Sequence, residues 1–210
     1  MGKLKFTSKV LGSVMTNVYL GENSETGEAF LIDPADRADV IEAWIAEQGV
    51  KLTAILLTHG HFDHIGAVNE LKKKYQAKVY AMEEERVILE DPALNLSGGW
   101  GASSVSVKTD VLLKDGQKLV IAGMPVTAYH TPGHTKGGAC YYFSEDGVLF
   151  SGDTIFCESV GRADLPTASA RALVKSVQRM IELLPEETRV FPGHDMETTI
   201  AHEKMYNPYI

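Results

Sequence analysis

The chain has 210 residues, of which 44% are hydrophobic and 23% charged, a composition typical of a folded protein rather than a disordered or fibrous one. Its 28 acidic residues outnumber its 20 basic ones, and the resulting net charge of −8 disfavours a sequence-independent grip on nucleic acid phosphates. We therefore expect a single domain over residues 1–210 that acts on a small molecule and not on nucleic acid.

The cysteines and the N-terminus bear on the cellular compartment. Cys140 and Cys157 do not form a CxxC pair, so we expect no disulfide framework and a reducing environment. The first residues contain no long apolar stretch, and Phe6 stands where a myristoylation signal requires Ser or Thr. These features predict a cytoplasmic protein without a membrane partner, and they leave the oligomeric state open.

Strand-like and helix-like patterns alternate in the first third of the chain. Residues 17–35 predict a β-hairpin, because two apolar runs flank the polar stretch ENSETGE. A helix is expected over 36–48, where apolar residues recur at helical spacing, and 52–57 form a short buried strand. Helical spacing resumes from residue 65.

The remainder of the chain is richer in strands. The Gly- and Ser-rich stretch 95–110 fits either a mobile lid beside an active site or a plain surface connection. A helix with Ser169 as its N-cap is expected over 169–184, before a last short strand at 189–191. The strands expected between these segments cover residues 118–123, 124–130, 137–143 and 147–153. Two sheets with helices on their outer faces would account for this order.

The stretch THGHFDHIGA (58–67) lies between a predicted strand and a predicted helix. Its histidines, His59, His61 and His64, offer imidazole nitrogens, and Asp63 adds carboxylate oxygens. First-row divalent metals take these ligands. One ion would leave at least one of the four side chains without a role, so the pattern predicts two ions.

Three further ligand candidates follow predicted strands, and each lies near a glycine that lets the backbone turn sharply. They are His134 in HTPGHT, Asp153 in FSGDT and His194 in FPGHD. The expected arrangement places His59, His61 and His134 on one ion, Asp63, His64 and His194 on the other, and Asp153 between them. His130 and His202 are expected to be ordinary structural histidines, with His130 as a candidate for contacting a ligand.

In this order, the motifs THGHFDHIGA, HTPGHT, SGDT and PGH resemble the metallo-β-lactamase superfamily. The resemblance covers almost the whole chain and implies an α/β fold, a four-layer αββα sandwich with a metal site at one edge. Residues 159–166 (SVGRADLP) and 198–210 are further similar to the short bacterial hydroxyacylglutathione hydrolases, or glyoxalase II enzymes. That similarity implies hydrolysis of S-lactoylglutathione, without the C-terminal helical domain that contacts glutathione in longer relatives.

The implied cofactors are two divalent ions, with zinc expected and iron or manganese as alternatives. A hydroxide bridging them would attack the thioester carbonyl, because metal coordination lowers the pKa of water to about 7. Asp63 would orient this nucleophile, and the thiolate would leave without a general acid because its pKa is about 8.5. Arg162 is a candidate substrate contact and is expected to pair with Asp164, whereas Cys157 is expected to fill space.

Other functions remain open at this point. Persulfide dioxygenases resemble the chain through GRAD and the same histidines, and they would hold a single iron through His59, His134 and Asp153. Lactonases and β-lactamases share the HxHxDH core, whereas the acidic charge weighs against a nuclease. A metal-binding protein without catalytic activity, built on the same fold, is the alternative from a different class.

Overall fold

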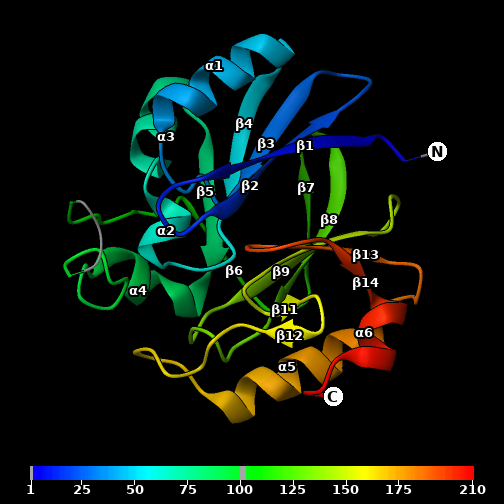
Figure 1. The fold of residues 1–210 in the computed structure, drawn as a ribbon. Helices are drawn as coiled ribbons and strands as arrows, with labels where there is room; N and C mark the ends of the chain where they lie inside the picture. The colour runs from blue at the N-terminus through cyan, green and yellow to red at the C-terminus, as the bar shows by residue number, and fades with distance from the viewer. Residues whose placement is uncertain (1, 100–102) are drawn as a thin grey trace.

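The computed structural model describes residues 2–99 and 103–210. Two sheets stack face to face, with helices on the outer side of each (Figure 1). The first sheet contains β1 (Leu4–Leu11), β2 (Thr16–Asn23), β3 (Glu28–Ile32), β4 (Lys51–Leu56), β5 (Lys78–Met82) and β6 (Val111–Leu113), in that spatial order. The second contains β7 (Gln117–Ile121), β8 (Met124–His130), β9 (Ala139–Phe143), β10 (Val148–Gly152), β13 (Arg189–Pro192) and β14 (Thr198–Thr199). Its spatial order is β14-β13-β10-β9-β8-β7.

Helices and short elements complete the four layers. On the side of the first sheet lie α1 (Ala38–Gln48), α2 (Phe62–Ile65), α3 (Val68–Tyr75), the 3-10 helix η1 (Glu83–Glu85) and α4 (Arg86–Glu90). The second sheet is covered by α5 (Ala170–Leu183) and α6 (Ile200–Tyr206), and a hairpin of β11 (Ile155–Phe156) and β12 (Ser159–Val160) follows β10 (Figure 1). This arrangement confirms the predicted αββα sandwich.

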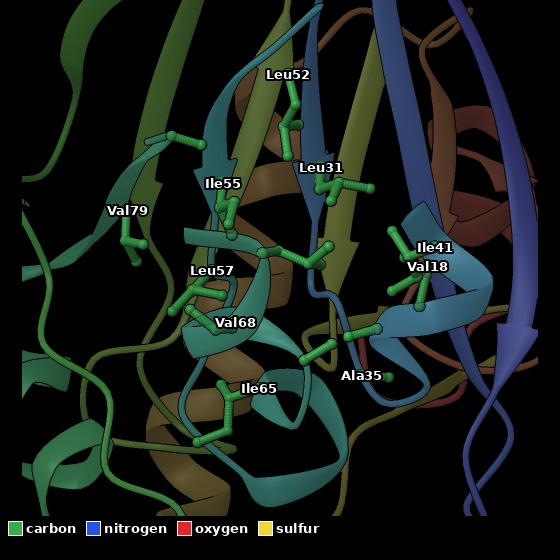
Figure 2. Close-up of a cluster of buried hydrophobic side chains, with 14 of the residues drawn as sticks. Val18, Leu31, Ala35, Ile41, Leu52, Ile55, Leu57, Ile65, Val68 and Val79 are labelled. Atoms are coloured by element: carbon green, nitrogen blue, oxygen red, sulfur yellow. The ribbon is translucent and has the colours of Figure 1, made fainter. Parts of the chain in front are cut away.

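Three hydrophobic clusters separate the layers because side chains alternate between the two faces of a strand. In β3, Leu31 points toward α1 while Phe30 points toward the second sheet. Figure 2 shows the outer cluster, in which Leu31 and Ile55 of the strands meet Ile41 and other helix residues. On the opposite side, α5 packs its apolar stripe on the second sheet. The central strands of each sheet are therefore buried on both faces.

The strand directions bring several chain segments to one edge of the sandwich. β10 pairs with β13 in parallel and with β9 in antiparallel, and β9 also pairs with β8 in antiparallel. β8, β10 and β13 therefore all point the same way, and the segments that follow them leave the second sheet at the same edge. The segments after β3 and β4 likewise leave the first sheet together, because these two strands are parallel.

Most predicted elements are confirmed, including the first hairpin, α1, β4 and α5. Ser169 caps α5 as predicted, with its hydroxyl accepting a 3.3 Å hydrogen bond from the amide of Ala172. The helix expected from residue 65 is wrong in one respect, because it is divided into α2 and α3. Gly66 lies at the break and donates its amide to the carbonyl of Ala35 at 2.8 Å, which pins the chain to the end of β3.

The stretch 95–110 can be described only in part, because residues 100–102 lie outside the described residues. On either side of them, Asn95 and Val107 are buried, and the Asn95 side chain donates a 2.8 Å hydrogen bond to the carbonyl of Val105. In the described parts of the chain, no helix combines the length and the apolar character that a membrane crossing requires.

Phe150 of β10 should be a major contributor to stability. Its ring contacts those of Phe6, Tyr19 and other aromatic residues between the sheets, and the side chain is fully buried. We expect Phe150→Ala to lower the free energy of unfolding by about 3–5 kcal/mol because it leaves a large cavity. Val120→Ala, at a position that is 70% exposed, should change it by less than about 0.5 kcal/mol. Urea unfolding followed by circular dichroism would measure the free energy of unfolding of both variants. Equal losses in the two variants would contradict the prediction that Phe150 is a major contributor to stability.

Candidate metal centre

The first cluster at this edge consists of His59, His61 and His134, whose candidate ligand atoms all lie within 4.8 Å of one another. His59 and His61 follow β4, and His134 follows β8. All three side chains are buried, and Nδ1 of His61 lies 2.9 Å from Nε2 of His134. The structure therefore brings together the three residues that were predicted to share one ion.

The second cluster consists of Asp63, His64 and His194, with ligand atoms that also lie within 4.8 Å of one another. Oδ2 of Asp63 is 3.5 Å from Nε2 of His64 and 3.3 Å from Nε2 of His194. Asp63 and His64 belong to α2, and His194 follows β13. This is the second predicted set.

Asp153, directly after β10, lies between the two clusters. Its Oδ2 atom is 3.4 Å from Nε2 of His134 and 3.6 Å from Nε2 of His194. Its Oδ1 atom is 3.5 Å from Nε2 of His64. One carboxylate thus reaches rings of both clusters, which is the position predicted for a bridging group.

Two glycines allow this close approach. Gly152 has a φ of 49°, a left-handed conformation that favours glycine, and a side chain there would collide with Thr58. A side chain at Gly193 would collide with the carboxylate of Asp153 and crowd the ring of His64. The prediction that glycines present the ligands is confirmed at both positions.

Hydrogen bonds fix the orientation of three rings. Nδ1 of His64 lies 2.9 Å from Oδ2 of Asp33, and Nδ1 of His134 lies 2.8 Å from the carbonyl oxygen of Arg162. Thr58 donates its hydroxyl proton to Asp33, so Nδ1 of His59, at 3.2 Å from that hydroxyl, must be the donor. Because each ring donates through Nδ1, each directs Nε2 toward the clusters.

The two clusters differ in their electrostatics. Burial, together with the neighbouring histidines, lowers the pKa of His61 to about 3 and that of His59 well below its usual value, so both rings are neutral. Burial also opposes a charge on His64, but the carboxylates of Asp63, Asp153 and Asp33 outweigh it and raise its pKa to about 10. The second cluster therefore favours a positive charge, which a divalent cation also supplies.

Unpaired atoms at the centre fit metal ligation. Nε2 of His59, Nε2 of His64 and Oδ1 of Asp153 are buried and have no hydrogen-bond partner among the described residues. Buried polar atoms without partners are costly and are uncommon in folded proteins. Neutral imidazole nitrogens and carboxylate oxygens are also the donors that zinc, iron and manganese accept.

Comparisons with known proteins identify the family. The family model of the metallo-β-lactamase superfamily matches residues 11–194. The chain belongs to this superfamily. The probable metallo-hydrolase YqgX of Bacillus subtilis (strain 168) is 33% identical over 208 residues, covering 99% of this chain and 98% of that protein.

Two solved structures match the fold closely. The BLEG-1 B3 metallo-β-lactamase matches with a TM-score of 0.92 and 40% identity, covering 98% of this chain and 99% of that one. TTHA1623 in a di-iron-bound form matches with a TM-score of 0.87 and 37% identity, covering 97% and 100%. The family predicted from the motifs is thus confirmed, and the comparisons support a metal-dependent hydrolase of this superfamily as the general class.

The sequence did not reveal two buried acidic residues that support the superfamily motif. Asp33 follows β3 and accepts hydrogen bonds from the amide of Thr58 at 2.7 Å and from its hydroxyl, in addition to contacting His64. It fastens the ends of the parallel strands β3 and β4 to a ligand candidate. Only the apolar run before Asp33 and the Pro34 that follows it hinted at a strand end.

Glu85, at the end of η1, joins the two loops that carry the first cluster. Its fully buried carboxylate accepts hydrogen bonds from the amide of Gly60 at 2.7 Å, the amide of Gly137 at 2.8 Å and the hydroxyl of Thr135 at 2.9 Å. Burial raises its pKa to about 7, although these three bonds favour the charged form. Glu85 therefore holds the HGH loop against the loop that follows His134.

Other candidates lie outside the two clusters. Arg162 pairs with Asp164 at 2.8 Å, as predicted, and its guanidinium is at the surface. His130 contacts the carbonyl oxygen of Lys136 and His202 contacts Glu158, each through Nε2, so neither reaches the centre. Cys157 and His202 group with Glu203, but the oxygens of Glu203 already accept bonds from Thr198, Asn207 and the amide of Glu158.

Glu85→Gln should weaken the first cluster. In the glutamine side chain, an NH2 group replaces one carboxylate oxygen and faces at least one of the three hydrogen-bond donors. We therefore expect the free energy of unfolding to fall by about 1–3 kcal/mol. Zinc affinity should fall by about tenfold or more, as for other groups that position ligands. Glu84→Gln, at the adjacent exposed position, is the matched control. Calorimetric zinc titration and urea unfolding would test this, and unchanged zinc affinity in Glu85→Gln would contradict it.

Proposed function

We propose that the chain is a dinuclear metallo-hydrolase that cleaves thioesters of small molecules. The observation that carries the proposal is the convergence of the seven ligand candidates, with the Asp153 carboxylate between two triads. The two irons in the similar TTHA1623 structure support two ions here as well. We propose zinc as the metal, with iron and manganese as alternatives.

The residues of the centre would have different roles in binding metal and orienting water. His59, His61 and His134 would hold one ion, and Asp63, His64 and His194 the other. Two divalent ions held there would lower the pKa of a bound water and polarise a carbonyl oxygen. Asp63 has a second task in the proposal, which is to orient the attacking water with its carboxylate. Thr16 supports it by donating a hydrogen bond to Oδ2 of Asp63 at 3.3 Å.

A thioester suits this site because the described part of the cavity lining offers no free proton donor for a leaving group. Among the described residues that line the cavity at the centre, every titratable side chain except Arg162 is assigned to a metal. Arg162 does not release its proton near neutral pH. A thiolate leaves without protonation because its pKa is about 8.5, whereas an amine needs a proton donor. The site therefore favours a thiol leaving group.

β-Lactam hydrolysis is a second candidate because BLEG-1, a B3 metallo-β-lactamase, is 40% identical to this chain. The amine that leaves when a β-lactam ring opens needs a proton donor, so it suits the cavity less well than a thiolate does. The single-iron persulfide dioxygenase remains an alternative through His59, His134 and Asp153, but it leaves the second cluster without a role. Metal-dependent oxygen uptake with a persulfide would identify that activity.

We also propose the setting in which the protein acts. Cys140 and Cys157 are both free thiols, which fits a reducing cytoplasm. The net charge of −8 supports a small-molecule substrate rather than nucleic acid. No membrane partner is proposed.

The first experiment is hydrolysis of S-lactoylglutathione by the zinc-loaded protein, followed by loss of thioester absorbance. A chelator-treated sample is the control, and a thioester of N-acetylcysteamine and a β-lactam complete the panel. We expect thioester hydrolysis that disappears with the chelator and returns with zinc. Hydrolysis of the β-lactam alone would reject the thioesterase proposal.

Asp153→Asn should separate the dinuclear assignment from its alternatives. Removing the bridging charge should weaken binding of the metals by about 100-fold, since even groups that only orient ligands contribute roughly 10- to 100-fold. Turnover should fall with metal content. Asp39→Asn, at an exposed residue paired with Arg37, is the control. Elemental analysis and kcat would be measured together, and full occupancy of two metals with normal turnover in Asp153→Asn would reject the bridge.

A further inference from the structure

A cavity of about 290 Å³ opens over the metal centre. His61, Asp63, His134, Asp153 and His194 contribute to its lining, so this is where a substrate would meet the metals. A larger hollow of about 670 Å³, lined in part by β1, β2 and β13, contains none of the seven ligand candidates. The substrate group nearest the reacting carbonyl must therefore fit the smaller cavity.

The walls of the smaller cavity are apolar. They are formed by Val14, Phe62, Leu96, Phe156 and Leu165, which come from five separate segments of the chain. Four of these side chains are half-buried, and Val14 is 45% exposed. Their partial exposure is unusual for residues of this type converging on one place, and such patches commonly mark binding sites.

Charge is scarce in the same walls. Apart from the ligand candidates, Arg162 is the one charged side chain among the described lining residues, and Asp164 already pairs with it at 2.8 and 2.9 Å. Glutathione carries two carboxylates and an ammonium group, so it would find few partners here apart from the metals. An apolar group, in contrast, would release water from all five side chains.

We propose that the substrate is a thioester with an apolar acyl chain, and that this chain occupies the cavity between Phe62, Phe156 and Leu165. The inference rests on the proposed thioesterase function and specifies its substrate class. Phe156 is well placed for this role, because its ring stands nearly perpendicular to that of His194, with the centroids 6.1 Å apart. The acyl chain would pack on Phe156, with the carbonyl directed toward the ligand candidates that line the same cavity.

Binding of non-hydrolysable thioethers tests the proposal without turnover. S-ethyl, S-butyl and S-hexyl derivatives of N-acetylcysteamine would be titrated into the zinc-loaded protein by calorimetry. We expect Kd to fall by up to about fourfold for each added methylene, from about 0.8 kcal/mol per buried methylene. A Kd that is independent of chain length would overturn the proposal.

Two variants assign the effect to the cavity. Phe156→Ala should remove most of the chain-length dependence, and Phe156→Leu, which keeps an apolar wall, should restore part of it. Val120→Ala on the exposed face of β7 is the control for loss of an apolar side chain elsewhere. Chain-length dependence that survives in Phe156→Ala and also in Leu165→Ala would place the acyl chain outside this cavity and overturn the proposal. Thermal unfolding of each variant would confirm that it is folded.

Hydrolysis of the matching acyl thioesters separates this inference from the proposed function. The kcat/KM should rise from acetyl to hexanoyl and should exceed that for S-lactoylglutathione. Chain-length-dependent binding without hydrolysis of any thioester would overturn the thioesterase function and leave the preference for an apolar group standing. Equal hydrolysis of acetyl, hexanoyl and lactoyl thioesters would overturn the preference and leave the function standing.

Discussion

The structure depends on one constraint. Five imidazoles and two carboxylates must lie close together, largely shielded from water, at one edge of the two-sheet sandwich. Buried polar groups are costly unless each finds a partner. The fold meets the constraint with strand direction, because β8, β10 and β13 all end at this edge and present His134, Asp153 and His194. The apolar clusters on both faces of each sheet hold these strand ends in place. Bound cations would then be the partners of the buried nitrogen and oxygen atoms that have no hydrogen-bond partner among the described residues.

Two buried acidic side chains convert this convergence into a defined geometry. Asp33 acts from the first sheet, where it binds Thr58 and sets the donor nitrogen of His64. Glu85 links the loop at Gly60, which follows a strand of the first sheet, to the loop at Gly137, which precedes a strand of the second. Neither is among the residues that line the cavity, but each holds the backbone beside a ligand candidate through hydrogen bonds. Preorganisation of the ligand candidates therefore comes from backbone amides and hydroxyls bound to carboxylates, as well as from the motif itself.

The ligand candidates could be predicted from the sequence because their signal is local: HxHxDH occupies one turn, and each later candidate follows an apolar run with a glycine nearby. The supporting residues lack such a signal. Glu85 is the last of three consecutive glutamates, and only the tertiary fold decides that it is buried while Glu84 is exposed. Strand β1 also escaped prediction, because it is an edge strand with alternating half-buried and exposed residues. The division between α2 and α3 depends on the contact between Gly66 and Ala35, which is equally invisible in a periodicity pattern.

The metal centre and the cavity walls come from different parts of the architecture. The ligand candidates follow strand ends, in short loops or in the short helix α2 after β4, in positions that the sandwich itself fixes. Four of the wall residues, Val14, Leu96, Phe156 and Leu165, lie in connections or at the end of a two-residue strand. Such segments tolerate substitution and insertion without loss of the core. Substrate choice can therefore change while the ligand set stays fixed, so in our proposal the ligand candidates supply the metal chemistry and the wall residues select the acyl group.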